Sequence, residues 1–320
     1  MARFDVFNGD ADGICALHQL RLAMPAEAEL VTGVKRDINL LRRVEPAEGD
    51  EVTVLDISLD KNRDDLQRIL DAGAFVRYFD HHYAGDLPEH ERLVAAIDPA
   101  PDVCTALLVD GALGGAHRAW AVVGAFGDNL DDSARRAAEP LDLSEERLAQ
   151  LRHLGILLNY NGYGAALEDL FFEPDELYLR VQPYPDPFAF ILEEPAFEYL
   201  EQGYAEDMER TEALKPESEG PHHALYLLPD APWARRVGGV LANDLANQAP
   251  ERAHAMLSAM PGGGYRVSVR APLANKQGAD ALCRQFPSGG GRAAAAGINE
   301  LPADQLEAFE KAFREAFSGS

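Results

Sequence analysis

The sequence predicts an α/β protein: a doubly wound parallel sheet in an N-terminal domain, followed by a smaller α/β C-terminal domain. The first observation is that short apolar runs alternate with segments of helical spacing over residues 4–126. The second is that several of these runs lead into an aspartate, as strands do when they deliver side chains to the carboxyl edge of an open sheet. The third is that a second set of strand-like and helix-like segments follows residue 221.

The elements of the N-terminal domain follow in order from the apolar pattern. Strands are expected at 4–7, 30–34, 52–55, 75–79 and 93–97. Helices are expected from about residue 14 to 22, and at 61–71, 104–113 and 117–126. This alternation favours a parallel sheet, because parallel neighbours need a crossover connection. It also puts Asp128 at the end of a helix or in the loop after it.

The remaining elements define the domain boundaries. Residues 143–170 have a helical pattern, which Pro183, Pro185, Pro187 and Pro195 are expected to break. A connecting helix ends near Pro216, and the polar stretch 217–221 is the best linker candidate. Beyond it, strands are expected at 224–228 and 265–269, and helices at 233–247 and 273–286. We therefore expect a first domain at 1–190, a connecting helix and linker at 191–220, and a second domain at 221–320.

The composition is that of a soluble globular protein. The 320 residues are 47% hydrophobic and 26% charged, and no apolar run approaches the ~20 residues of a membrane span. No basic segment followed by an apolar one begins the chain, so a cytoplasmic location is expected. Cys15, Cys104 and Cys283 are scattered without CxxC spacing, which indicates reduced thiols rather than disulfides or a zinc site.

The charge balance restricts the class of partner. The net charge of −25, from 54 acidic and 29 basic residues, disfavours binding of long duplex nucleic acid. It is compatible with a small anionic substrate held by metals and a few arginines. An adaptation of the surface to a salty cytoplasm would give the same charge.

Aspartates at strand ends are candidate metal ligands. Asp10 and Asp12 lie in a turn between Gly9 and Gly13, where such a pair can bind two different ions. The alternative is an ordinary turn in which an aspartate caps a helix. The case for metal binding strengthens because Asp56 and Asp128 occupy equivalent ends.

The triplet Asp80-His81-His82 is the most specific string in the chain. One imidazole can complete a metal shell while its neighbour points toward the substrate, and the aspartate can bind the metal or orient a histidine. The alternative is a helix cap or a surface turn. Carboxylates with one or two imidazoles suit Mn²⁺ or Mg²⁺, and such a centre is typical of a metal-dependent phosphoesterase.

A glycine-rich run, residues 288–297, is the candidate anion site of the C-terminal domain. Glycines at positions such as Gly290 and Gly291 let backbone amides approach a phosphate, and Arg292 can clamp the anion. The alternative is a flexible surface loop.

These residues resemble the DHH phosphoesterase superfamily, which is named for a triplet such as Asp80-His81-His82. Residues 10–13 resemble its first motif, Asp56 its second, the triplet its third and Asp128 its fourth. Residues 289–297 resemble the glycine-rich motif of the DHH-associated C-terminal domain. The resemblance covers nearly the whole chain.

The resemblance implies a two-domain enzyme whose active site lies in the cleft between the domains, with one or two Mn²⁺ ions. Two ions are expected; Mg²⁺ or Co²⁺ would also fit. The implied metal ligands are Asp10, Asp12, Asp56, His81 and Asp128, with Asp56 as bridge. Asp56 and His82 would be catalytic, and His82 would contact the scissile phosphate. The implied substrate-binding residues are Asn8, His82, Gly290, Gly291 and Arg292.

Two positions depart from the family pattern. Some branches have a histidine four residues before the first aspartate, where this chain has Val6, so one metal site is expected to be weak or completed by water. Nuclease branches commonly have histidine in the glycine-rich motif, where this chain has Arg292. The arginine is closer to the version in alanyl-tRNA synthetase C-terminal domains.

The sequence thus predicts a Mn²⁺-dependent phosphodiesterase or exonuclease. Its substrates would be short single-stranded oligonucleotides or dinucleotides. Known members of the superfamily are RecJ-like single-strand exonucleases, nano-RNases that degrade very short oligonucleotides, and phosphodiesterases for cyclic dinucleotides or their linear products. A catalytically weak nucleotide-binding or sensor protein with the same fold is the alternative. A homodimer remains open, and no membrane partner is expected.

Overall fold

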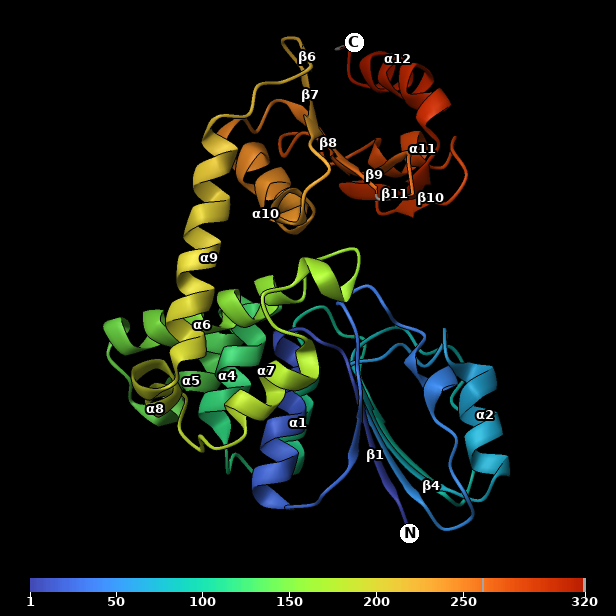
Figure 1. Ribbon diagram of the computed structural model, residues 1–320, viewed down its shortest axis with the longest axis vertical. Helices are drawn as coiled ribbons and strands as arrows, with labels where there is room; N and C mark the ends of the chain where they lie inside the picture. Colours follow the sequence, from blue (N-terminus) through green and yellow to red (C-terminus); the bar gives the residue numbers. More distant parts are fainter. Residues whose placement is uncertain (261, 319–320) are drawn as a thin grey trace. The chain divides into compact units, whose positions relative to one another are not determined.

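The computed structural model describes residues 1–260 and 262–318. The chain divides into two compact units, Met1–Tyr204 and Ala205–Ser320, called the first and second units below. Both contain a sheet with helices on its faces, so the predicted α/β class is confirmed (Figure 1). Among the described residues, no helix combines the length and the apolar character that crossing a membrane requires.

The sheet of the first unit has five strands in the order β2-β1-β3-β4-β5, and all of its neighbours are parallel. The strands are β1 (Arg3–Phe7), β2 (Glu29–Val31), β3 (Glu51–Leu55), β4 (Phe75–Asp80) and β5 (Leu93–Ile97). The strand order reverses between β1 and β3. Open α/β sheets bind ligands at such a point, outside the carboxyl ends of the strands.

Helices cover both faces of this sheet, as the doubly wound prediction requires (Figure 1). On one face, α2 (Arg63–Asp71) packs its Leu66 and Ile69 against Val6 and Val54. On the other face lie α1 (Ala11–Ala23), α4 (Arg118–Gly127) and α6 (Glu145–Asn161). Successive residues of a strand point to opposite faces. In β1 and β3 the face toward α2 is apolar, whereas the opposite face carries Phe7 and Leu55 beside the polar side chains of Asp5 and Thr53.

Short helices complete the first unit. They are α3 (Thr105–Ala112), α5 (Asp131–Ala138), α7 (Pro174–Val181), α8 (Pro187–Glu193) and the start of α9 (Pro195–Glu212). The four prolines do interrupt the helical pattern: Pro183 and Pro185 lie between α7 and α8, and Pro187 and Pro195 each begin a new helix. Proline is tolerated in the first turn, where its missing N–H would have had no partner.

The second unit has a mixed sheet in the order β10-β11-β9-β8-β7-β6. Its strands are β6 (Ser218–Glu219), β7 (His223–Leu228), β8 (Ala253–Ala259), β9 (Tyr265–Arg270), β10 (Gly289–Gly291) and β11 (Ala295–Leu301). Its helices are α10 (Pro232–Gln248), α11 (Ala279–Cys283) and α12 (Leu306–Ala316). Part of the stretch expected as a linker is therefore strand β6, and the helix expected at 273–286 is limited to α11.

Candidate metal centre

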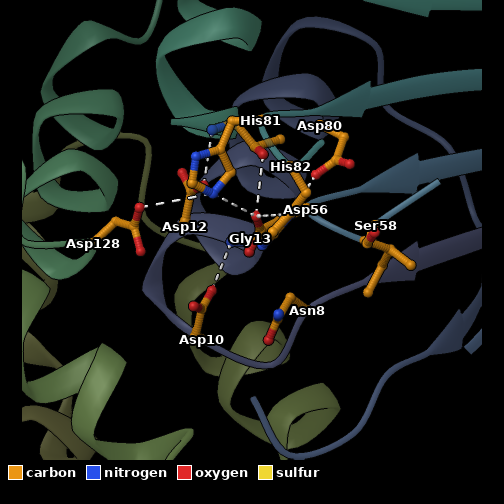
Figure 2. A network of polar contacts seen from close by, with 12 residues as sticks. Asn8, Asp10, Asp12, Gly13, Asp56, Ser58, Asp80, His81, His82 and Asp128 are labelled. Atoms are coloured by element: carbon orange, nitrogen blue, oxygen red, sulfur yellow. Dashed lines mark hydrogen bonds and ion pairs between the residues drawn. The ribbon is translucent and has the colours of Figure 1, made fainter. Parts of the chain in front are cut away.

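Side chains from four segments meet at the carboxyl edge of the first sheet (Figure 2). Asp10 and Asp12 follow β1, and Asp56 follows β3. His81 and His82 follow β4, and Asp128 follows α4, as the sequence predicted. Two groups of these residues have potential ligand atoms within 4.8 Å of one another: Asp56, His81, His82, and Asp12, His81, Asp128.

His81 lies at the centre of the carboxylates. Its Nε2 is 3.3 Å from Asp56 Oδ1, 3.7 Å from Asp128 Oδ2 and 3.9 Å from Asp12 Oδ2. Its Nδ1 donates a hydrogen bond to the carbonyl oxygen of Val103 at 2.9 Å. Because a carbonyl can only accept, this bond fixes the ring and directs Nε2 toward the carboxylates, the usual arrangement of a metal-binding histidine.

Asp12 is held by the start of helix α3. The backbone N–H groups of Thr105 and Ala106 donate to its two carboxylate oxygens at 2.8 and 2.7 Å. Cys104 is the N-cap residue of α3, but its side chain accepts no hydrogen bond from the helix. The carboxylate of Asp12, which belongs to α1, caps α3 instead. Each oxygen retains a lone pair that can bind a cation.

Asp56 occupies a left-handed backbone position at the end of β3, with φ of 59°. Its N–H donates to the carbonyl oxygen of Phe79 at 3.0 Å, which continues the pairing of β3 with β4. Thr105 Oγ1 donates to Asp56 Oδ1 at 3.2 Å. Aspartate is one of the few non-glycine residues that adopt this backbone conformation at low cost.

Burial and crowding make ionisation of these carboxyls unfavourable. Burial and the charge of Asp56 raise the pKa of Asp12 to about 7, and burial and Asp10 raise the pKa of Asp56 to about 7. Burial and Asp12 raise the pKa of Asp128 to about 6. A divalent cation would offset this repulsion, and carboxylate oxygens with one imidazole nitrogen fit Mn²⁺ or Mg²⁺.

Asp80 orients His82 and lies outside both groups. His82 Nδ1 donates to Asp80 Oδ1 at 2.6 Å, and the His82 side chain is 41% exposed. The sequence left open whether Asp80 binds a metal or orients a histidine, and the geometry favours the second role. The exposed ring of His82 can reach a substrate.

Lys35 is the site residue that the sequence reasoning missed. Its Nζ forms an ion pair with Asp10, lies 3.7 Å from Asp128 Oδ1 and donates to Asn159 Oδ1 at 2.9 Å. Burial alone would raise the pKa of Asp10, but Lys35 and the Gly13 N–H outweigh it and lower that pKa. Lys35 comes shortly after β2, so its place near a strand end was a signal that could have been used.

Asn8 and Val6 are both buried, but only Asn8 offers a polar atom. Asn8 Nδ2 donates to the carbonyl oxygen of Lys35 at 3.3 Å, and Asn8 Oδ1 has no hydrogen-bond partner among the described residues. A Cβ at Gly13 would lie 2.2 Å from the carbonyl oxygen of Asn8, which explains that glycine. Val6 packs in the core with α2 and supplies no ligand.

The predicted anion site, Gly290, Gly291 and Arg292, belongs to the second unit. Gly290 and Gly291 lie in β10, which pairs with β11 as an antiparallel hairpin rather than forming a loop. Gly291 has φ of 135°, and a Cβ there would be 2.5 Å from Ala296 Cα, so glycine is required. Arg292 is exposed at the turn, and its N–H donates to the carbonyl oxygen of Ala295 at 2.9 Å.

Neither a scan against models of protein families nor a search of curated proteins finds a match. Solved structures do match. An exonuclease RecJ bound to manganese has a TM-score of 0.64 at 17% identity, over 98% of this chain and 90% of that one. RecJ from Thermus thermophilus in complex with Mn²⁺ has a TM-score of 0.66 at 18% identity; the alignment covers 98% of this chain and only 51% of that one.

A third similar structure is a pGpG-specific phosphodiesterase, PggH, from Vibrio cholerae. Its TM-score is 0.55 at 14% identity, and the alignment covers 99% of both chains. At these identities the likeness concerns the fold. The chain therefore has a RecJ-like fold.

Proposed function

We propose that this protein is a metal-dependent phosphodiesterase that hydrolyses short single-stranded oligonucleotides or dinucleotides. The observation that carries the proposal is the position of His81 Nε2, within 4 Å of carboxylates from three separate segments. The similar folds support the same class of reaction, because they include an exonuclease with bound manganese and a phosphodiesterase for a dinucleotide.

Asp12, Asp56, His81 and Asp128 would hold the cation. Mn²⁺ is the ion we favour, and Mg²⁺ or Co²⁺ would also fit this donor set. A divalent cation in such a site supplies Lewis-acid stabilisation of phosphate charge and lowers the pKa of a bound water. Asp56 is the central ligand in this proposal, because its Oδ1 lies 3.3 Å from His81 Nε2 and 3.9 Å from His82 Nδ1.

His82 would act on the phosphate itself. Because its Nδ1 is held by Asp80, its Nε2 is the atom left to donate a hydrogen bond to a phosphate oxygen. Asp80 is buried and acts through His82 as a positioning residue. Asn8 Oδ1, which is buried at the end of β1, is a candidate acceptor for a substrate group or a water.

The second unit would supply substrate binding. We assign to Gly290, Gly291 and Arg292 the recognition of a terminal phosphate or carboxylate, for which an exposed guanidinium is suited. The net charge of −25 supports short substrates over long ones, because the repulsion grows with each phosphate.

Hydrolysis of a series of single-stranded substrates, from a dinucleotide to long strands, tests the proposal with Mn²⁺, Mg²⁺ and Co²⁺. We expect Mn²⁺-dependent cleavage that is fastest on the shortest substrates, with no cleavage of duplex. The Asp56→Asn variant should lose nearly all of this activity. Wild-type protein that cleaves neither these substrates nor bis(p-nitrophenyl) phosphate would end the proposal.

The alternative is a catalytically weak protein that binds nucleotides. Two observations favour it: Val6 is buried in the core, and Asp10 is paired with Lys35. It predicts that wild type binds a dinucleotide in the presence of Mn²⁺ and releases it intact. Product analysis after prolonged incubation separates the two functions.

A further inference from the structure

The two oxygens of Asp10 are already engaged by groups of the protein. Oδ1 accepts a hydrogen bond from the Gly13 N–H at 3.1 Å, and Oδ2 is paired with Lys35 Nζ. Among the described residues, Asp10 belongs to neither group of potential metal ligands. Asp10 is thus paired with the ammonium group of Lys35, although its position in the sequence is that of an expected metal ligand.

Lys35 is held in place by several contacts. Its Nζ donates to Asn159 Oδ1 at 2.9 Å, and Asn159 Nδ2 donates to the Tyr163 hydroxyl at 2.9 Å. Its backbone N–H donates to the carbonyl oxygen of Gly162 at 2.9 Å. The end of α6 therefore fixes both the backbone and the ammonium group of Lys35, and Asn159 is itself buried.

Asp128 lies between Lys35 and His81. Its Oδ1 is 3.7 Å from Lys35 Nζ, and its Oδ2 is 3.7 Å from His81 Nε2. In a two-metal centre a carboxylate between the two ions has this arrangement, and the ions are about 3.5–4 Å apart. Here one side of that carboxylate faces an ammonium group.

We propose that the Lys35 ammonium occupies the position of a second cation, so that this centre binds a single divalent ion at Asp12, Asp56, His81 and Asp128. This inference rests on the cation site of the proposed function and deepens it. An ammonium group supplies one positive charge and hydrogen-bond donors, but it cannot lower the pKa of a bound water as a metal does. Lys35 thus stabilises Asp10 and Asp128 as a positioning residue.

The test is the number of Mn²⁺ ions bound per chain, measured on the full-length protein by equilibrium dialysis with metal analysis. We expect one ion in the wild type. In Lys35→Met the side chain keeps its length and loses its charge, which frees Asp10 and Asp128, so two ions should bind. Electron paramagnetic resonance should then show the spin coupling of two Mn²⁺ ions ~4 Å apart.

Two variants control this measurement. Lys61→Met makes the same change at an exposed lysine whose ion-pair partner is Asp60, and it should still bind one ion. Lys35→Gln removes the charge but can still donate to Asn159, so it gives a second chance of a folded protein if Lys35→Met unfolds. It should also bind two ions.

Wild type that binds two ions or none would overturn the inference, and so would Lys35 variants that still bind only one. Phosphodiester cleavage, measured on the same samples, separates this result from the proposed function. Cleavage by a wild type with two ions would refute the role of Lys35 and leave the function intact. One bound ion without cleavage would refute the function and leave the role of Lys35 intact.

Discussion

Asp56 combines a backbone role with a charge role, and substitution can separate them. Its φ of 59° is tolerated by asparagine but strained for alanine by ~1 kcal/mol. Asp56→Asn should therefore lower phosphodiester cleavage by about 10³-fold, from the loss of several kcal/mol of charge stabilisation. It should unfold at no lower urea concentration than wild type, because crowding disfavours the charge it removes. Asp56→Ala should be equally inactive and less stable.

Asp142 offers a matched control for Asp56. It is an exposed aspartate that also has a left-handed backbone, with φ of 47°, and it lies outside both groups of potential ligands. Asp142→Asn should keep full activity. Retained cleavage in Asp56→Asn would contradict the role assigned to this carboxylate.

His18 is expected to make the first unit sensitive to acid. Its Nε2 donates to the carbonyl oxygen of Tyr184 at 2.9 Å, and its ring lies 4.8 Å from that of Trp120. Burial lowers its pKa from 6.5 to about 4. Between those values the unfolded chain binds a proton that the folded chain does not, so stability is full above pH 6.5 and falls as the pH falls.

The predicted loss attributable to His18 is about 2 kcal/mol of unfolding free energy between pH 7 and pH 5. The His18→Gln variant should not show this loss of unfolding free energy. Urea unfolding of the variant and of wild type at pH 7 and pH 5 measures the difference. His222→Gln, at an exposed position, should lose as much stability as wild type. Equal losses in His18→Gln and wild type would refute this account.

At the residue scale, the sequence identified the carboxylates but not their pairing. Asp10, Asp56 and the histidines were found because they follow strands that end at one edge of the sheet. Lys35 was missed because it follows the edge strand β2 after a gap. Side-chain geometry decides that Asp10 pairs with the Lys35 ammonium and that Asp12 belongs to a group of potential metal ligands. The sequence does not show this geometry, so both aspartates were predicted to be metal ligands.

At the scale of elements, close contact between helices positions Asp128. A Cβ at Gly127 would lie 2.3 Å from Ala11 Cβ and 2.8 Å from the carbonyl oxygen of Gly155. Ala11 lies between Asp10 and Asp12 at the start of α1. Gly127 therefore lets α4 approach α1 and α6 closely enough for Asp128 to reach the other carboxylates.

Gly127→Ala should separate these helices. We expect a loss of about 1–3 kcal/mol in stability and at least tenfold weaker Mn²⁺ binding, measured by thermal unfolding and metal titration. Gly111→Ala is the control, because a Cβ there meets nothing within 4 Å; it should keep Mn²⁺ binding and gain up to about 1 kcal/mol. Wild-type Mn²⁺ affinity in Gly127→Ala would contradict this role of the glycine.

The elements of the first unit were predicted better than those of the second. The five strands of the first sheet were recognised because each is a short apolar run with polar neighbours. Strand β10 was missed because its residues, Gly289–Gly291, have no side chains that could alternate. Strand β8 is covered on both faces and nearly all of its residues are buried, so its sequence does not alternate between apolar and polar residues either.

For the molecule as a whole, a cation in the centre should stabilise the first unit. At a free Mn²⁺ concentration of 100 times the Kd, linkage gives about 2.7 kcal/mol. Calorimetry should show a higher Tm with Mn²⁺ for wild type and little change for Asp56→Asn.

Carboxylates raise the pKa of His81 to about 10 against the effect of burial. Mn²⁺ binding should therefore release a proton from His81, and the increase in Tm caused by Mn²⁺ should be larger at higher pH.

The overall fold was predictable because the alternation of strands and helices has few solutions, and the order β2-β1-β3-β4-β5 brings β1 and β3 together at the edge where ligands bind. The most direct measurement of the central claim is anomalous diffraction at the manganese edge from crystals soaked in Mn²⁺. We predict an anomalous peak at bonding distance from side-chain atoms of Asp12, Asp56, His81 and Asp128. No manganese among these four side chains would contradict the account.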